Sequence, residues 1–251
     1  MARDPQGALV ALNRFGFGAR GAAASDFSSA ASDPRGFVKA ELGRPNAALL
    51  DAPGLQPTPV LAQAVFDYQK DVKQQRENAA RTAEAMASSS AGKPSEAKAA
   101  AGEMQGASKA DMMSNGAMPD AMSPKAAPPK EPAKPLNIIQ KTFRAEALAR
   151  LQRATMAECG FVERLVTFWS NHFCTSANKG ELARMWAGAF EREAIRPHVL
   201  GNFGEMLRAV EQHPAMIFFL DNQQSIGPDS RAGQNRKKGL NENLAREIME
   251  L

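Results

Sequence analysis

The sequence predicts an all-α fold, a multi-helix and bundle-like domain interrupted by a long disordered insertion. Apolar residues recur at three- and four-residue spacing through most of the chain, and no segment alternates between apolar and polar residues for long. A third observation predicts the insertion, because the composition changes abruptly from residue 84 to residue 134. Of the 251 residues 43% are apolar, which is enough for one sizeable core or two small ones.

Three helices are expected before the insertion. The first spans Pro5–Phe15 and ends at a Gly-Phe-Gly turn, where glycine permits a positive φ. The second opens at Asp33, an N-capping residue followed by proline, and runs to about Leu42. The third follows the proline at position 59. Its apolar stripe consists of Val60, Leu61, Ala64, Val65 and Tyr68.

The predicted insertion consists mostly of Ala, Ser, Pro, Gly, Lys and Met, without any aromatic or β-branched residue. Such a segment buries too little apolar surface to offset its chain entropy. We therefore expect residues 1–83 to be N-terminal helices, residues 84–134 to be disordered, and residues 135–251 to be the helical core of the same domain. The N-terminal part is too small to fold alone, which favours a single domain.

The aromatic string Phe161–Phe173 is expected to organise the second half, with two later segments packed against it. Gly160 separates it from the preceding helix, Pro197 interrupts the helix that follows, and Pro214 opens a very apolar turn. The helices predicted after the insertion are about Leu136–Cys159, Phe161–Phe173, Leu182–Arg196, Phe203–Val210 and Leu240–Leu251.

Composition and motifs argue against several classes of function. The net charge of +4 comes from mixed acidic and basic residues, so no nucleic-acid partner is predicted. The chain has no run of about 18 apolar residues and therefore no predicted membrane span. It also shows no signal peptide, which makes a cytoplasmic location the default. Cys159 and Cys174 match no disulfide framework or metal spacing, and no phosphate loop, dinucleotide fingerprint or hydrolase elbow occurs.

Four ionisable residues fall on helix faces that are predicted to be buried. At about 100° per residue, His172 lies within the apolar stripe of its helix, Glu193 and Arg196 within that of the next, and Glu247 within that of the last. A buried charge is costly unless it is paired, hydrogen-bonded or bound to a metal. These four residues are therefore the candidate catalytic site.

Two interpretations of these residues stay open. In the first, the charges form an internal salt-bridge network in a structural or partner-binding protein. Glu193 pairs with Arg196, and His172 is hydrogen-bonded to a backbone carbonyl. Glu247 pairs with Arg192, Arg196 or Arg246. This interpretation predicts that no open cleft forms.

The second interpretation is an enzyme that uses metal-assisted or acid–base chemistry between helices. Carboxylates and imidazoles on facing helices hold di-metal centres in helical bundles, so a divalent metal is the implied cofactor. His172, Glu193 and Glu247 are its candidate ligands, and His213 is a further donor. The chain lacks the Glu-x-x-His step typical of such bundles, which counts against this interpretation.

Several strings in the chain resemble the motifs of a known family, the bacterial DUF1800 proteins. They are Leu12–Gly18 (LNRFGFG), Phe168–Phe173 (FWSNHF), Phe190–His198 (FEREAIRPH), His213–Met216 (HPAM) with Asp221-Asn222, and Gly239–Glu247 (GLNENLARE). The last string has Leu244 where the family usually has tyrosine. The family motifs include all four of the ionisable residues above.

The resemblance implies a fold and a partner rather than a reaction, since the family is a domain of unknown function. Its members are longer and continue past the last motif with Leu-His-Thr-Leu-Gly, so this chain is expected to be an N-terminal fragment. In bacterial genomes, genes of family members often lie next to a gene for a DUF1501-family protein, which is the implied partner. Some family members carry export signals. We expect a DUF1800-like helical protein that is structural or partner-binding, with an enzyme as the alternative.

Overall fold

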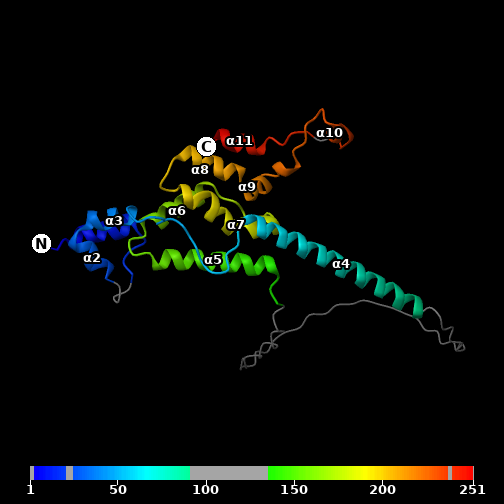
Figure 1. The fold of residues 1–251 in the computed structure, drawn as a ribbon, viewed down its shortest axis with the longest axis horizontal. Coiled ribbons are helices and arrows are strands. Elements are labelled where there is room, and N and C mark those ends of the chain that lie inside the picture. The colour runs from blue at the N-terminus through cyan, green and yellow to red at the C-terminus, as the bar shows by residue number, and fades with distance from the viewer. Residues whose placement is uncertain (1–2, 21–24, 91–134, 237–238, 251) are drawn as a thin grey trace, which may run out of the picture. The chain divides into compact units, whose positions relative to one another are not determined.

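The computed structural model describes residues 3–20, 25–90, 135–236 and 239–250 (Figure 1). Every regular element within these ranges is a helix, and none of them contains a strand. The predicted all-α class is therefore confirmed. Residues 91–134, which make up most of the predicted disordered insertion, lie outside the described residues. None of the described helices is long and apolar enough to cross a membrane.

The first helices form a small cluster of their own. α1 (Pro5–Val10) runs directly into a π-helical turn, η1 (Ala11–Phe15), and α2 (Asp26–Ser32) and α3 (Pro34–Leu42) follow. The Asp33 carboxylate accepts the Gly36 N–H at 2.9 Å and caps α3, as its position before a proline predicts. α2 has no counterpart among the predicted helices, because its Ala/Ser sequence lacks an apolar stripe. The hydrophobic core of this cluster consists of Ala8, Leu12, Ala30 and Ala31.

α4 (Thr58–Ser90) is a single helix of 33 residues. It continues well past Tyr68, where the apolar stripe fades, because the residues that follow are mostly Ala, Gln, Lys, Arg and Glu with high helix propensity. Residues 84–90 of the predicted insertion are therefore helical. The chain divides into two compact units, Met1–Asp71 with Leu136–Leu251, and Val72–Pro135. All sites described below lie within the first unit.

Three helices form the centre of the first unit: α5 (Ile138–Met156), α6 (Phe161–His172) and α7 (Glu181–Phe190). Gly160 precedes α6 with a φ of 78°, a left-handed conformation that favours glycine. α7 packs against α5 on one side and against α9 (Pro214–Phe219) on the other. Its buried residues, each at most 3% exposed, are Ala183, Met185, Trp186, Ala189 and Phe190.

The chain continues from α7 into a π-helical turn, η2 (Glu191–Ile195), and a 3-10 turn, η3 (Arg196–His198). The predicted helix over Leu182–Arg196 is thus regular only as far as Phe190. The hydrogen bonds of a π-turn join residues five apart instead of four apart. Side chains beyond Phe190 are therefore rotated away from the positions that a regular α-helix at about 100° per residue would give them. The later elements are α8 (Phe203–Gln212), α9, η4 (Asn222–Gln224), α10 (Arg231–Arg236) and α11 (Asn243–Glu250).

α6 buries a different face from the one predicted. Val162, Glu163 and Val166 are at most 3% exposed, whereas Phe168 is 59% exposed and His172 is also exposed. The predicted burial of His172 is therefore wrong. Both faces of this helix carry apolar residues. The face with Val162 and Val166 packs into the core, and part of the aromatic face remains exposed to solvent.

Candidate functional site

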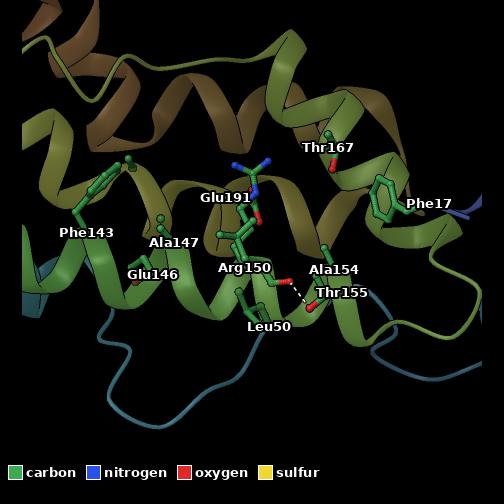
Figure 2. Close-up of a pocket in the computed structure, with 13 residues that line it drawn as sticks. Phe17, Leu50, Phe143, Glu146, Ala147, Arg150, Ala154, Thr155, Thr167 and Glu191 are labelled. Atoms are coloured by element: carbon green, nitrogen blue, oxygen red, sulfur yellow. Dashed lines mark hydrogen bonds and ion pairs between the residues drawn. The ribbon is translucent and has the colours of Figure 1, made fainter. Parts of the chain in front are cut away.

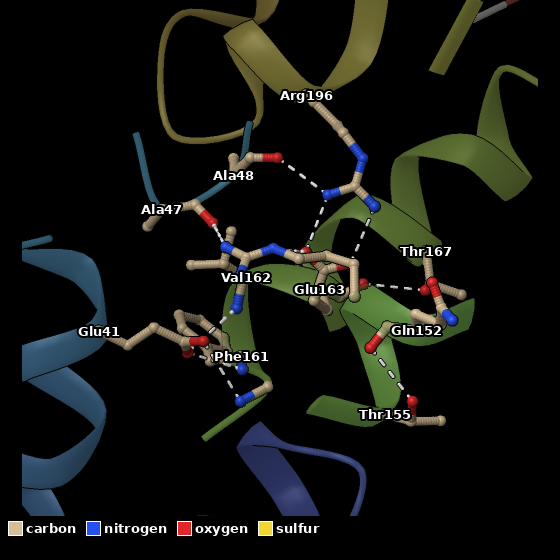
Figure 3. A network of polar contacts seen from close by, with 12 residues as sticks. Glu41, Ala47, Ala48, Gln152, Thr155, Phe161, Val162, Glu163, Thr167 and Arg196 are labelled. Atoms are coloured by element: carbon tan, nitrogen blue, oxygen red, sulfur yellow. Dashed lines mark hydrogen bonds and ion pairs between the residues drawn. The ribbon is translucent and has the colours of Figure 1, made fainter. Parts of the chain in front are cut away.

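Arg196 lies at the centre of a buried ionic network (Figure 3). Its side chain has no solvent exposure, so its predicted burial is confirmed. Its Nη1 and Nη2 atoms donate to the two carboxylate oxygens of Glu163 at 2.8 and 2.9 Å, and Nε donates to Glu191 at 2.9 Å. Nη1 also donates to the Ala48 carbonyl at 2.9 Å. Every nitrogen of the guanidinium therefore has an acceptor.

More exposed groups complete this network. Arg150 lies 2.8 Å from Glu191, and the Ser170 hydroxyl donates to the same carboxylate at 3.1 Å. Burial acts to lower the pKa of Arg196, but the carboxylates of Glu163 and Glu191 outweigh it and hold the pKa above its usual value. Arg196 is thus permanently charged, which suits a fixed ion pair and not proton transfer.

The predicted pair of Glu193 with Arg196 is wrong, and the π-turn explains why. The Arg196 N–H donates to the Glu191 carbonyl across η2, which brings residues five apart onto the same side of the turn. The neighbouring Arg192 binds Glu146 through two hydrogen bonds of 3.0 and 2.7 Å. Arg192 and Arg196 therefore pair with acidic residues other than Glu193.

Glu193 instead joins the start of α4 to His213. One carboxylate oxygen accepts the backbone N–H of Thr58 at 2.9 Å, and the other lies 3.4 Å from His213 Nε2. The Thr58 hydroxyl lies 3.2 Å from the same nitrogen. Because His213 Nδ1 accepts the Ala215 N–H at 3.1 Å, a neutral His213 carries its proton on Nε2, facing Glu193 and Thr58.

This small cluster keeps the Glu193 carboxylate ionised. Burial acts to raise the pKa of Glu193, but hydrogen bonds from His213 and Thr58 outweigh burial and lower the pKa overall. The Glu193 side chain is 31% exposed, so it is only partly shielded from water. The arrangement places an ionised carboxylate beside an imidazole N–H, a combination that can accept and relay a proton.

His172 and Glu247 are not part of this cluster. The contacts of the His172 ring are aromatic, with ring centroids 6.4 Å from Phe168, 5.6 Å from Trp169 and 4.7 Å from Phe173. Glu247 is exposed on α11, and among the described residues no arginine lies within ion-pair distance of it. Its predicted burial and its predicted pairing with an arginine are therefore wrong.

The described part of the chain contains no group of three or more His, Cys, Asp or Glu side chains that could hold a metal ion. The structure thus does not gather His172, Glu193 and Glu247, with or without His213, into the predicted divalent-metal centre. A catalytic role for these residues stays a prediction.

An apolar groove of about 540 Å³ runs along α5 (Figure 2). Phe143 and Phe17 lie at its opposite ends, and the lining residues of α5 recur from Phe143 to Thr155 at helical spacing. These twelve steps of helix extend for about 18 Å. Leu151, which lines the groove, is 62% exposed, so the groove is open to solvent. The expected absence of an open cleft is therefore wrong.

Gly188 allows α5 and α7 to approach closely beneath this groove. A Cβ atom at position 188 would lie 2.3 Å from the Cβ atom of Glu146, which is closer than real Cβ atoms come. The acidic residues at the groove are already engaged, Glu146 with Arg192 and Glu191 with Arg150 and Arg196. The groove therefore offers an apolar surface with internally compensated charge.

One family profile matches this chain, that of the family described as "Protein of unknown function (DUF1800)", over residues 10–251. The chain belongs to the DUF1800 family. No curated protein and no solved structure matches it.

Within this DUF1800 chain, the string FEREAIRPH supplies most of the polar contacts described above. Its members in those contacts are Glu191, Arg192, Glu193 and Arg196. Their acidic partners Glu146 and Glu163 lie outside the family strings and were missed by sequence reasoning. The sequence does contain one feature that could have predicted the role of Glu163. It lies between Val162 and Val166, which puts an acid on a second apolar face of α6.

Proposed function

We propose that this DUF1800 chain is a partner-binding helical domain, and that its groove along α5 receives an amphipathic helix of another protein. The observation that carries the proposal is the groove itself, which is apolar, follows one helix for about three turns and is open to solvent at Leu151. Apolar helix faces bind such grooves through residues spaced at i, i+3, i+4 and i+7.

The walls of the groove favour a helix over a compact ligand. Small side chains at Ala147, Ala154 and Ala187 permit close backbone approach, and the two terminal phenylalanines offer large contact surfaces. The charged groups beneath it already have partners, so a ligand with an apolar face leaves no buried charge uncompensated.

A DUF1501-family protein is the candidate partner. This choice rests on the resemblance to a family whose genes lie next to genes for such proteins. The groove supplies a surface of suitable chemistry. The buried ionic network then has a structural role: it holds α5, α6 and η2 in the arrangement that forms the groove.

Two leucines on α5 provide a matched test. Leu151 lines the groove and is 62% exposed, whereas Leu148 is 56% exposed and lies outside the lining. Leu151→Asp should weaken binding to the DUF1501-family protein at least tenfold, about 1.4 kcal/mol, when measured by titration calorimetry. Leu148→Asp should leave the affinity unchanged. Equal affinities of both variants and the unaltered chain would exclude the groove as the binding site. No binding by the unaltered chain would exclude this protein as the partner.

A second candidate function is acid–base chemistry centred on Glu193, with His213 and Thr58 as its hydrogen-bond partners. It is favoured by one observation, the partly exposed carboxylate whose pKa is lowered by its partners despite burial. The test is the stability of Glu193→Gln: a strained functional carboxylate gives a more stable variant, and a structural one gives a less stable variant.

A further inference from the structure

The rim of the α5 groove carries positive charge that no carboxylate compensates. Lys141 and Arg144 lie near the Phe143 end of the groove, and both are exposed (Figure 2). Arg144 precedes the lining residues Ala147 and Leu151 by three and seven positions, so all three lie on one stripe of the helix. Among the described residues, neither Lys141 nor Arg144 has a carboxylate within ion-pair distance.

A third cation lies toward the Phe17 end of the groove. Arg164 on α6 is exposed and lies one turn before the lining residue Thr167, on the same side of the helix. Its Nη1 atom donates to the backbone carbonyls of Asn13 and Gly16 at 3.1 and 2.7 Å, and both acceptors are neutral. The charge of Arg164 is therefore held beside the groove without being neutralised.

The acids that line the groove do not balance these cations. Glu146 and Glu191 are almost completely buried, and each is paired with arginines of the internal network. The exposed Asp51, which follows the lining residue Leu50 in the sequence, is an acid without an ion pair in the described part of the chain. Uncompensated positive charge thus exceeds uncompensated negative charge at the rim, which favours an occupant of the opposite sign.

We propose that the occupant of the groove is an acidic amphipathic helix, in which Asp or Glu residues flank the apolar face and meet Lys141, Arg144 and Arg164. This inference rests on the proposed function, because it specifies the charge of the helix that the groove receives. The apolar face supplies most of the affinity, and the flanking acids supply specificity and faster association. Helices with the same apolar face and basic flanks are selected against.

Two synthetic peptides of about 15 residues, long enough to span the groove, test the charge preference of the full chain. Both are stapled as helices and share one apolar face, and they differ only in carrying Glu or Lys at the flanking positions. In fluorescence anisotropy at low salt, the Glu peptide should bind at least about fivefold more tightly than the Lys peptide. In 0.5 M NaCl the ratio should fall below about twofold, because salt screens exposed charges.

Two charge reversals of the chain locate this preference. Arg144→Glu should weaken binding of the Glu peptide about fivefold at low salt and strengthen binding of the Lys peptide. Arg208→Glu is the control, because Arg208 is an exposed residue of α8 outside the groove lining and its reversal changes the net charge equally. It should alter neither affinity by more than about twofold, since distant exposed charges are screened.

Three results would overturn the proposal, and they separate it from the proposed function. Equal binding of both peptides, abolished by Leu151→Asp, would retain a helix-binding groove but exclude the acidic helix. A preference for the Glu peptide that falls equally in Arg144→Glu and Arg208→Glu would attribute it to the net charge of +4 and not to the rim. Binding of neither peptide would exclude the helix-binding groove itself.

Discussion

At the residue scale, Arg196 is held in a fully buried position because each of its nitrogens has an acceptor. The bidentate contact with Glu163 joins η3 to α6, and the contact with the Ala48 carbonyl joins η3 to the loop before α4. Such a pair adds little net stability compared with an apolar replacement, but it specifies one geometry. This behaviour fits a residue that positions helices.

Glu193→Gln is expected to destabilise the fold by about 1 kcal/mol at pH 7, because the charged contact with the first turn of α4 becomes a neutral one. The folded-state pKa of Glu193 is lowered, so its carboxylate stabilises the fold above the unfolded-state pKa, and this contribution is lost as pH falls through the folded-state pKa. The destabilisation measured by urea denaturation should therefore be smaller at pH 3 than at pH 7. A more stable variant at pH 7 would instead support the acid–base alternative.

At the element scale, the start of α6 shows how a distant side chain fixes a helix. The carboxylate of Glu41 on α3 accepts the N–H groups of Gly160, Phe161 and Val162 at 3.3, 2.8 and 3.3 Å (Figure 3). These are N–H groups that the helix itself leaves without acceptors, and a negative charge is favoured there. The nearby Cys159 thiol has its pKa raised to about 11, first by burial and then by the charge of Glu41.

Removing this cap should destabilise the domain measurably. Glu41→Ala leaves three N–H groups without their acceptor, and we expect a loss of about 2 kcal/mol in the free energy of unfolding. Glu158→Ala is the control, because Glu158 is exposed and, within the described ranges, bonded only to the exposed Arg44. It should change stability by less than about 0.5 kcal/mol. Similar losses for the two variants, measured by urea denaturation, would show that the cap is unimportant.

Helical spacing and capping residues were sufficient to predict α3, α5 and α6 and the all-α class from sequence. The same spacing failed for side-chain partners. A wheel at a constant 100° per residue cannot anticipate the π-turn Glu191–Ile195, so it paired Arg196 with the wrong acid. It also cannot choose between two apolar faces of α6, a choice that depends on what packs against them, and it therefore placed His172 in the core.

At the scale of the whole molecule, the N-terminal residues as far as Asp71, which include the first part of α4, belong to one compact unit with Leu136–Leu251. The core of this unit takes Leu61 and Val65 from α4 and Ile139 from α5. The contacts that build the groove and the ionic network therefore do not require residues 72–135.

Shortening the insertion tests this division. Replacing Ser88–Pro132 with a short Gly/Ser linker should change Tm by less than about 2 °C, because loop-closure entropy depends only weakly on loop length. Differential scanning calorimetry of the shortened and the full chain gives the comparison. A large drop in Tm would mean that the replaced segment contributes to the fold.

The most direct test of groove binding is a photo-crosslink from the groove to its occupant. A benzophenone side chain is placed at position 151 in one variant and at position 148 in another, and each is irradiated with the DUF1501-family protein. Partner binding in the groove predicts a crosslinked product from position 151 alone, with the attachment site on one apolar helix face of the partner. A product from position 148 alone would contradict it.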